Sequence, residues 1–163
     1  MVIREAQPSD VDYLAPRLRQ ADVRGLQAGS GSTPLQALQR GYTLSVPRCT
    51  IIGNQGQPVA MFGVVPWPND NGLVWLLATD DLSKRPLLSQ FLRDARKYVG
   101  GLHNFYPRLI LYTDEGNTVL IKWLTQLGFE VCNRIPEYGV EKRPYLTLER
   151  TRSLCVTPPQ SWQ

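Results

Sequence analysis

The chain has 163 residues, of which 42% are hydrophobic and 20% are charged. This length and composition suit one globular domain with its own core, and they argue against wholesale disorder. The net charge of +4 is too small to indicate a nucleic-acid-binding protein by itself, and no apolar run approaches the ~18 residues of a membrane span. The segment Met1–Glu5 lacks the apolar core of a signal peptide, so a cytoplasmic protein is expected.

The sequence contains no metal-binding motif. Its three cysteines, Cys49, Cys132 and Cys155, lie far apart, and His103 is the single histidine. Structural zinc sites use Cys and His at close spacing. We therefore expect no metal site, and we expect buried, unpaired cysteines and an exposed histidine in a loop.

The N-terminal third is predicted to contain a strand followed by helices. Met1–Ala6 has the pattern of a short strand, and Ser9 is placed to cap the helix that follows. Gln20–Thr33 is rich in glycine and is predicted to be a mobile loop. Pro34 favours the start of a short helix, which Gly41 is expected to end.

The rest of the chain alternates between strand and helix patterns. We expect three strands, a helix, a strand, a helix and two final strands, at Cys49–Ile52, Pro58–Pro66, Leu73–Thr79, Leu87–Val99, Arg108–Tyr112, Asn117–Leu127, Glu130–Arg134 and Tyr145–Glu149. Leu73–Thr79 is apolar throughout, which is typical of a central strand buried on both faces. This order predicts an α/β (α+β) sandwich, a mixed twisted sheet flanked by helices, over residues 1–149, with a C-terminal tail at 150–163.

The order of elements resembles the GCN5-related N-acetyltransferase (GNAT) fold. Residues 3–10 resemble the first strand and helix cap of that family, and Leu73–Thr79 stands where its fourth strand contacts acetyl-CoA. The run Asn117-x-x-Leu120-x-x-x-Leu124-x-x-Leu127-Gly128-Phe129 is similar to the C-terminal Asn…Leu-Gly-Phe signature of the family. The resemblance implies an acetyl-CoA site with cofactor-binding positions at Leu77, Ala78, Thr79, Lys84, Arg85, Leu87 and Asn117.

Three departures from the family pattern concern the chemistry. The resemblance implies a glycine-rich loop that cradles the CoA pyrophosphate with backbone N–H groups, but Asp80–Leu87 has no glycine, and Pro86 lacks an N–H. The general-acid tyrosine of many family members falls at Leu124, and the fourth strand has no carboxylate before Asp80 to serve as general base. We therefore assign no catalytic residue, and we expect acetyl-CoA to bind weakly or not at all.

A narrower resemblance agrees with these departures. Val74–Asp80 and Leu109–Phe129 resemble the small acetyltransferase-like internal virion proteins of T-odd-type short-tailed phages. This resemblance implies a phage protein, located in the virion or the host cytoplasm, that acts as a structural or binding module on a virion or host protein. The alternative is an active, divergent N-acetyltransferase that transfers acetyl from acetyl-CoA to a host protein or a small amine.

The expected tail carries candidate anchors for a protein partner. Leu154, Val156 and Trp162 follow the last predicted strand, and buried aromatic side chains often supply much of the binding energy at interfaces. Four basic residues lie near the last strand, at Lys142, Arg143, Arg150 and Arg152. A solvated face is the favoured interpretation of these residues, and a nucleic-acid contact is the less favoured one.

Overall fold

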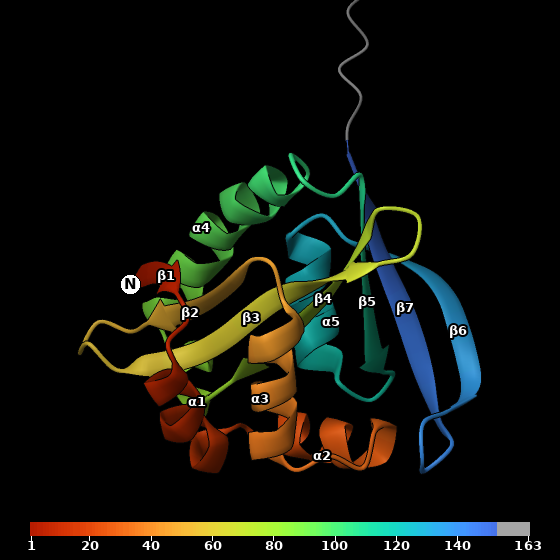
Figure 1. Ribbon diagram of the computed structural model, residues 1–163, viewed down its shortest axis with the longest axis horizontal. Helices are drawn as coiled ribbons and strands as arrows, with labels where there is room; N and C mark the ends of the chain where they lie inside the picture. The colour runs from red at the N-terminus through yellow and green to blue at the C-terminus, as the bar shows by residue number, and fades with distance from the viewer. Residues whose placement is uncertain (153–163) are drawn as a thin grey trace, which may run out of the picture.

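The computed structural model describes residues 1–152 (Figure 1). Its strands and helices follow in the order β1 (Val2–Glu5), α1 (Pro8–Leu14), η1 (Ala15–Arg17), α2 (Gln20–Gly29), α3 (Pro34–Leu44), β2 (Arg48–Ile52), β3 (Pro58–Trp67), β4 (Asn71–Ala78), η2 (Asp80–Ser83), α4 (Leu87–Leu102), β5 (Arg108–Asp114), α5 (Thr118–Gln126), β6 (Glu130–Tyr138) and β7 (Arg143–Thr151). The elements η1 and η2 are short 3-10 helices.

The seven strands form one mixed sheet in the order β1-β2-β3-β4-β5-β7-β6. Neighbouring strands are antiparallel except β4 and β5, which are parallel. Helices α1 and α3 pack on one face of the sheet, and α4 and α5 pack on the other (Figure 1). The predicted α/β fold with a mixed sheet between helices is therefore confirmed, with β4 at the centre of the sheet.

Each face of the sheet has its own hydrophobic core, because side chains alternate along a strand. On β3, Ala60 and Val64 point toward α4 and α5, whereas Met61 points toward α1 and α3. Phe91 of α4 is 3% exposed, and its ring meets Trp123 of α5 edge-on at 5.8 Å between centroids. The two one-sided apolar helices predicted from the sequence thus cover one face of the sheet.

The predicted loop Gln20–Thr33 is wrong, because most of it is the helix α2. The glycines make this helix weak by itself, but tertiary hydrogen bonds hold its C-terminal end. Val140 N and Glu141 N, in the β6–β7 turn, donate to the carbonyl oxygens of Gly29 and Ala28 at 3.0 and 3.1 Å. These partners lie far along the chain, so the local pattern did not indicate the helix.

The ends of two other helices also differ from the prediction. Helix α1 begins at Pro8, where a missing N–H does no harm, so Gln7 rather than Ser9 is the capping residue. Helix α3 continues past Gly41 to Leu44. A Cβ at Gly41 would collide with the Trp75 indole of β4, so this glycine permits close packing of the helix on the sheet rather than ending it.

The C-terminal half follows the predicted signature closely. The Asn117 side chain accepts a hydrogen bond from Leu120 N and caps α5. Gly128 takes the left-handed conformation, with φ at +94°, and Phe129 packs into the core. Strand β7 continues to Thr151, and the tail side chains Leu154, Val156 and Trp162 lie outside the described residues, as does Cys155.

Two expectations about burial are wrong. Cys132 is exposed, because it lies on β6 at the edge of the sheet, whereas Cys49 is buried as expected. His103 is only 7% exposed. It follows the last residue of α4, and its Nδ1 lies 3.0 Å from the Tyr106 carbonyl oxygen. The chain therefore turns back over this histidine and covers it.

Candidate functional site

Strands β4 and β5 separate in the middle of the sheet and leave a cleft. Their pairing is limited to Gly72 with Leu109 and Leu73 with Ile110. Beyond these pairs the strands diverge, and a cleft of about 260 Å³ lies between β4, β5, α2 and the first turn of α5. The side chains of β4 along this opening are only half-buried, so the predicted burial of this strand on both faces is not complete.

Two residues near the start of α2 occupy the open side of β4. Arg19 N donates to the Ala78 carbonyl oxygen at 2.8 Å, and the Asp22 carboxylate accepts a hydrogen bond from Ala78 N at 2.9 Å. A bridge between Leu18 and Thr79 continues this pairing. The segment before α2 therefore pairs with the end of β4 as an added strand would, and both backbone polar groups of Ala78 are taken.

The side chains of Arg19 and Asp22 form a buried ion pair at this position. Arg19 Nη2 lies 2.7 Å from Asp22 Oδ1, and each residue is 5% exposed. The Arg19 guanidinium also lies over the Trp123 ring, 4.7 Å from its centroid, and so joins the start of α2 to α5. Burial raises the pKa of Asp22, although the hydrogen bonds from Arg19 and from Ala78 N oppose this shift.

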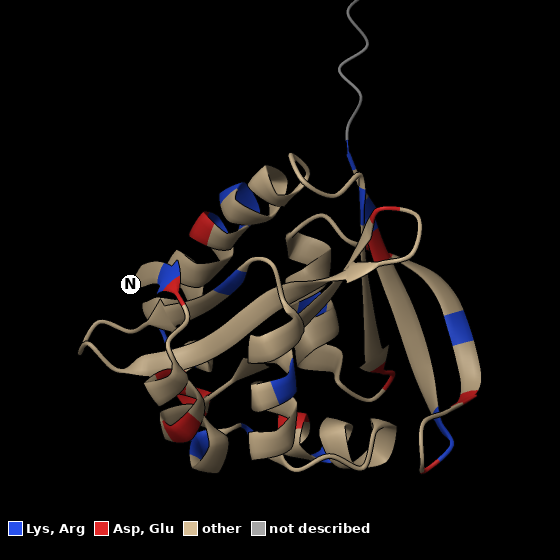
Figure 2. Cartoon of the chain, viewed as in Figure 1, with Lys and Arg blue, Asp and Glu red and all other residues tan. Residues whose placement is uncertain are grey.

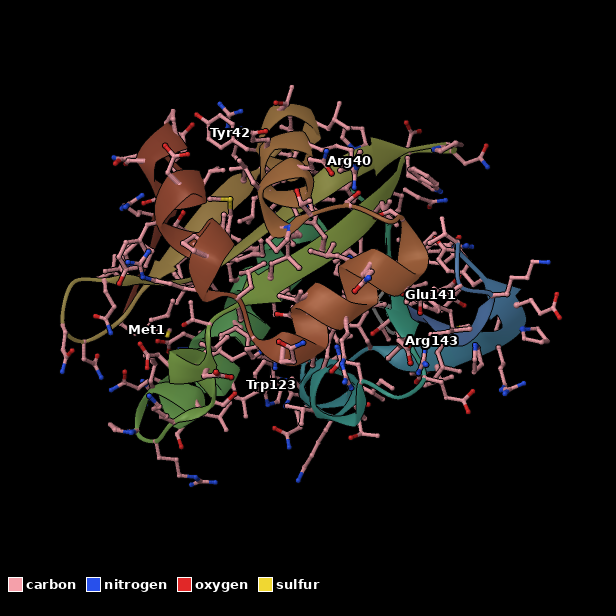
Figure 3. The ribbon with its side chains drawn as sticks, turned by 90° about the horizontal axis from the view of Figure 1, so that it is seen from below. Met1, Arg40, Tyr42, Trp123, Glu141 and Arg143 are labelled. Carbon is pink, nitrogen blue, oxygen red and sulfur yellow. The ribbon has the colours of Figure 1, made fainter. Side chains whose placement is uncertain are left out.

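Helix α2 lies along one side of the cleft. Figure 3 shows it running from beside Trp123 toward Glu141 of the β6–β7 turn and Arg143 at the start of β7. The Tyr145 hydroxyl of β7 donates to the Gly25 carbonyl oxygen at 3.0 Å. Helix α2 is thus hydrogen-bonded to β4 near its start, and to β7 and the β6–β7 turn further along. It forms one wall of the cleft.

Three tyrosines line the far wall of the cleft and its surroundings. The rings of Tyr112 and Tyr138 stack at 5.6 Å between centroids, and those of Tyr138 and Tyr145 meet at 4.4 Å. Burial, followed by the charge of Asp114, raises the pKa of Tyr145 to about 12. Burial also raises the pKa of Tyr138. The phenols of Tyr138 and Tyr145 therefore remain protonated at neutral pH and present hydroxyl groups rather than charge.

The structure brings part of the expected cofactor site together. Leu77 and Asn117 both line the cleft. Ala78 adjoins the cleft, but its N–H donates to the Asp22 carboxylate of α2, and its carbonyl oxygen accepts a hydrogen bond from Arg19 N, just before that helix. Thr79 N and Thr79 Oγ1 both donate to the Val59 carbonyl oxygen, so this residue serves the β3–β4 pairing.

Two backbone positions between β4 and α4 cannot donate to an anion. Lys84 N donates to the Asp81 carbonyl oxygen, and Lys84 Nζ is paired with the Asp81 carboxylate at 2.7 Å. Pro86 precedes the helix and offers no N–H. Leu87 is buried in the core, and Arg85 points into solvent. Expected cofactor positions Lys84, Arg85 and Leu87 therefore do not converge on the cleft.

The catalytic positions of the family pattern carry no acid or base. Leu124 is 3% exposed and belongs to the hydrophobic core between the sheet and the helices α4 and α5. In the part of the chain that the structure describes, no group of three or more His, Cys, Asp or Glu side chains could hold a metal ion. No helix within residues 1–152 is long and apolar enough to cross a membrane.

Several solved structures similar to this chain are described as acetyltransferases. A GNAT-superfamily phosphinothricin acetyltransferase from Sinorhizobium meliloti, in complex with AcCoA, has a TM-score of 0.68 and 12% identity, over 93% of this chain and 88% of that one. A spermidine N-acetyltransferase from Vibrio cholerae, in complex with CoA and spermine, has a TM-score of 0.67 and 10% identity, over 93% and 95%. A ribosomal-protein-alanine N-acetyltransferase from Brucella melitensis has a TM-score of 0.65 and 18% identity, over 93% of this chain and 99% of that one.

These likenesses define the class: the chain has the GNAT acetyltransferase fold. No family model matches the sequence, and no curated protein matches it. The identities are low, so the shared property is the fold. The position that the family resemblance implies for acetyl-CoA differs here in two respects: Arg19 and Asp22 bind both backbone polar groups of Ala78, and Lys84 N and Pro86 supply no free donor after that strand.

Sequence reasoning missed Arg19 and Asp22. Their spacing of three residues suits an ion pair on one helical turn, but Asp22 lies in the segment Gln20–Thr33 that was predicted to be a loop, where this spacing carries no signal. Their common partner, Ala78 N, lies 56 residues from Asp22 along the chain, and no local pattern indicates such a contact.

Proposed function

We propose that this protein uses the GNAT fold as a binding module rather than for acetyl transfer, and that it acts through a protein partner. The observation that carries the proposal is the buried Arg19–Asp22 pair on the peptide of Ala78. An incoming ligand would have to displace two hydrogen bonds to this peptide and separate a buried ion pair. Breaking such a pair costs about 3–5 kcal/mol, which amounts to a loss of more than about 100-fold in affinity.

The segment between β4 and α4 supports the same proposal. A pyrophosphate group is usually bound by several backbone N–H groups near the start of a helix. Here the Lys84 N–H is used within the turn, the Lys84 side chain is paired with Asp81, and Pro86 has no N–H. Little compensation is therefore available for the cost of displacing Arg19 and Asp22.

Exposed apolar side chains support a role in protein contacts. Phe105 is 73% exposed, Val46 is 65% exposed and Trp67 is 42% exposed. Large apolar side chains of this kind are often used at interfaces. The proposed setting is a phage particle or the infected host cytoplasm, and its support is the resemblance of Val74–Asp80 and Leu109–Phe129 to internal virion proteins.

The second candidate is an active, divergent N-acetyltransferase. It is favoured by the cleft between β4 and β5 and by the protonated phenols of Tyr138 and Tyr145 beside it. For this function, Arg19 and Asp22 would have to release Ala78 before acetyl-CoA could enter.

Calorimetry with acetyl-CoA separates the two candidates. The binding-module proposal predicts a Kd of about 1 mM or weaker for the wild-type chain. The variant R19A/D22A, which removes the ion pair and frees Ala78 N from Asp22, should bind at least as tightly as the wild type. D94N, which removes an exposed carboxylate remote from the cleft, is the matched control. Low-micromolar binding by the wild type, accompanied by acetyl transfer to a polyamine or a lysine peptide, would contradict the proposal.

A further inference from the structure

A cluster of basic side chains lies where the end of α4 meets the end of β7. Arg96, Gly100 and His103 follow one another at i, i+4 and i+7, so they lie along one stripe at the end of α4. Arg150 and Arg152 are two residues apart and reach this stripe from β7 and the residue after it. Figure 2 shows basic residues both on the upper part of α4 and at the end of β7.

Contacts place the guanidinium groups of Arg150 and Arg152 against the end of α4. Arg150 Nη1 and Nη2 lie 4.0 Å from the position that a Cβ on Gly100 would take, and Arg150 Nε lies 2.9 Å from the corresponding position on Gly128. Arg152 Nη2 donates a hydrogen bond to the His103 carbonyl oxygen. Because Gly100 has no side chain and is exposed, the Arg150 guanidinium lies next to the helix backbone, one turn after Arg96.

The positive charge of this cluster is not compensated by ion pairs within the described residues. The ion pairs of the surrounding basic residues join Arg93 to Asp94 and Arg108 to Glu149 and do not involve Arg96, Arg150 or Arg152. Residues 153–163 contain no Asp or Glu that could supply a carboxylate side chain. Burial and the nearby charge of Arg96 lower the pKa of Arg150, which reflects the same lack of compensation.

Two enclosed nitrogen atoms of the cluster also lack hydrogen-bond partners. Arg150 Nη1 and His103 Nε2 make no hydrogen bond within residues 1–152, although each is shielded from solvent. His103 is 7% exposed, and its other ring nitrogen, Nδ1, is engaged with the Tyr106 carbonyl oxygen. A buried donor without a partner is costly, and a partly buried charge without a counter-charge is more so. Because His103 Nδ1 must donate to the Tyr106 carbonyl oxygen and burial lowers the pKa of His103, Nε2 is a lone-pair acceptor and contributes nothing to anion binding. The cluster therefore offers an anion the charge of its arginines and the unused Nη1 of Arg150.

We propose that Arg96, Arg150 and Arg152 form a binding site for a phosphate group. A tetrahedral dianion suits them because it can accept hydrogen bonds from several directions, and guanidinium groups match phosphate oxygens in geometry as well as in charge. The proposed phosphate site lies away from the end of β4 where the family resemblance places acetyl-CoA. Arg150 is paired with Leu109, which in turn is paired with Gly72 at the start of β4, whereas Ala78 lies at the other end of that strand.

Titration with inorganic phosphate tests the proposal on the full chain. Calorimetry at constant ionic strength should show saturable binding, and sulfate should compete. R96Q should weaken phosphate binding about tenfold, because it removes one charge-assisted contact from an exposed residue. R93Q is the matched control. It makes the same charge change on the same helix, but Arg93 is paired with Asp94 outside the cluster, so its affinity should stay within about twofold of the wild type.

Phosphoserine and adenosine monophosphate distinguish the source of the phosphate. A gain of about tenfold for one of them over inorganic phosphate would identify a modified protein or a nucleotide as the carrier. Equal affinities would assign the site to the free anion. The proposal is overturned if the wild type shows no saturable phosphate binding, if chloride at the same ionic strength has the same effect, or if R96Q and R93Q lose affinity equally. Thermal unfolding of each variant establishes that it is folded.

Discussion

The buried pair formed by Arg19 and Asp22 makes a sharp prediction for stability. The substitution D22A removes a carboxylate that accepts hydrogen bonds from Arg19 Nε at 3.2 Å, from Arg19 Nη2 at 2.7 Å and from Ala78 N at 2.9 Å. It leaves a buried guanidinium without its counter-charge and a buried N–H without an acceptor. Removing one partner of such a pair costs about 3–5 kcal/mol, so we expect D22A to lower the free energy of unfolding by that amount.

The double variant and the conservative variant sharpen this test. R19A/D22A removes both charges, so it should cost less than the sum of the single changes, with a coupling energy of about 2–3 kcal/mol. D22N keeps one acceptor oxygen and should cost less than D22A. Urea denaturation followed by circular dichroism measures the wild type, D22A, R19A, R19A/D22A and D22N. A loss below about 1 kcal/mol for D22A, or strictly additive single changes, would refute the view that this pair fixes α2 to the sheet.

Three further predictions concern the core, acid stability and the tail. F91A should cost about 3–5 kcal/mol in urea denaturation, because the ring is buried against Trp123, and a loss under about 1 kcal/mol would place it outside the core. Burial by itself would raise the pKa of Asp10, but hydrogen bonds from Arg4 and other neighbours lower it overall. Its stabilisation is therefore present above the unfolded pKa of about 4 and is lost as pH falls through the lower folded value, and D10N should flatten that acid limb in pH-dependent unfolding. Deleting residues 153–163 keeps the whole of β7, so we expect an unchanged melting temperature and a loss of partner contact in cross-linking, whereas a large fall in melting temperature would oppose the proposed role of the tail in binding.

The elements that could be predicted are those whose signal is local. Helices α4 and α5 each carry a one-sided apolar stripe, and Asn117 and Gly128 mark the beginning and end of α5 with side-chain and backbone properties of their own. The strands from β2 to β5 are apolar runs between turn residues. For these segments local preference and tertiary packing agree, and the fold followed from their order.

The features that could not be predicted depend on distant contacts. Helix α2 is rich in glycine, and hydrogen bonds from the β6–β7 turn, more than 100 residues later, hold its end. The pair formed by Arg19 and Asp22 has its function only because Ala78 lies beside it in the fold. His103 is buried because the loop to Tyr106 folds over it. In each case the decisive partner is set by the tertiary structure and leaves no periodic pattern in the sequence.

Amide NMR measures directly whether Arg19 and Asp22 occupy the position on β4 that we propose is closed to acetyl-CoA. Titration of acetyl-CoA into the uniformly labelled wild-type chain should leave the amide signals of Leu77, Ala78 and Asn117 unshifted up to about 1 mM ligand. The Ala78 amide should also exchange slowly with solvent, because Asp22 accepts its hydrogen bond within the protein. Saturable shifts of these amides at low-micromolar acetyl-CoA, together with release of the Ala78 amide to fast exchange, would contradict the account.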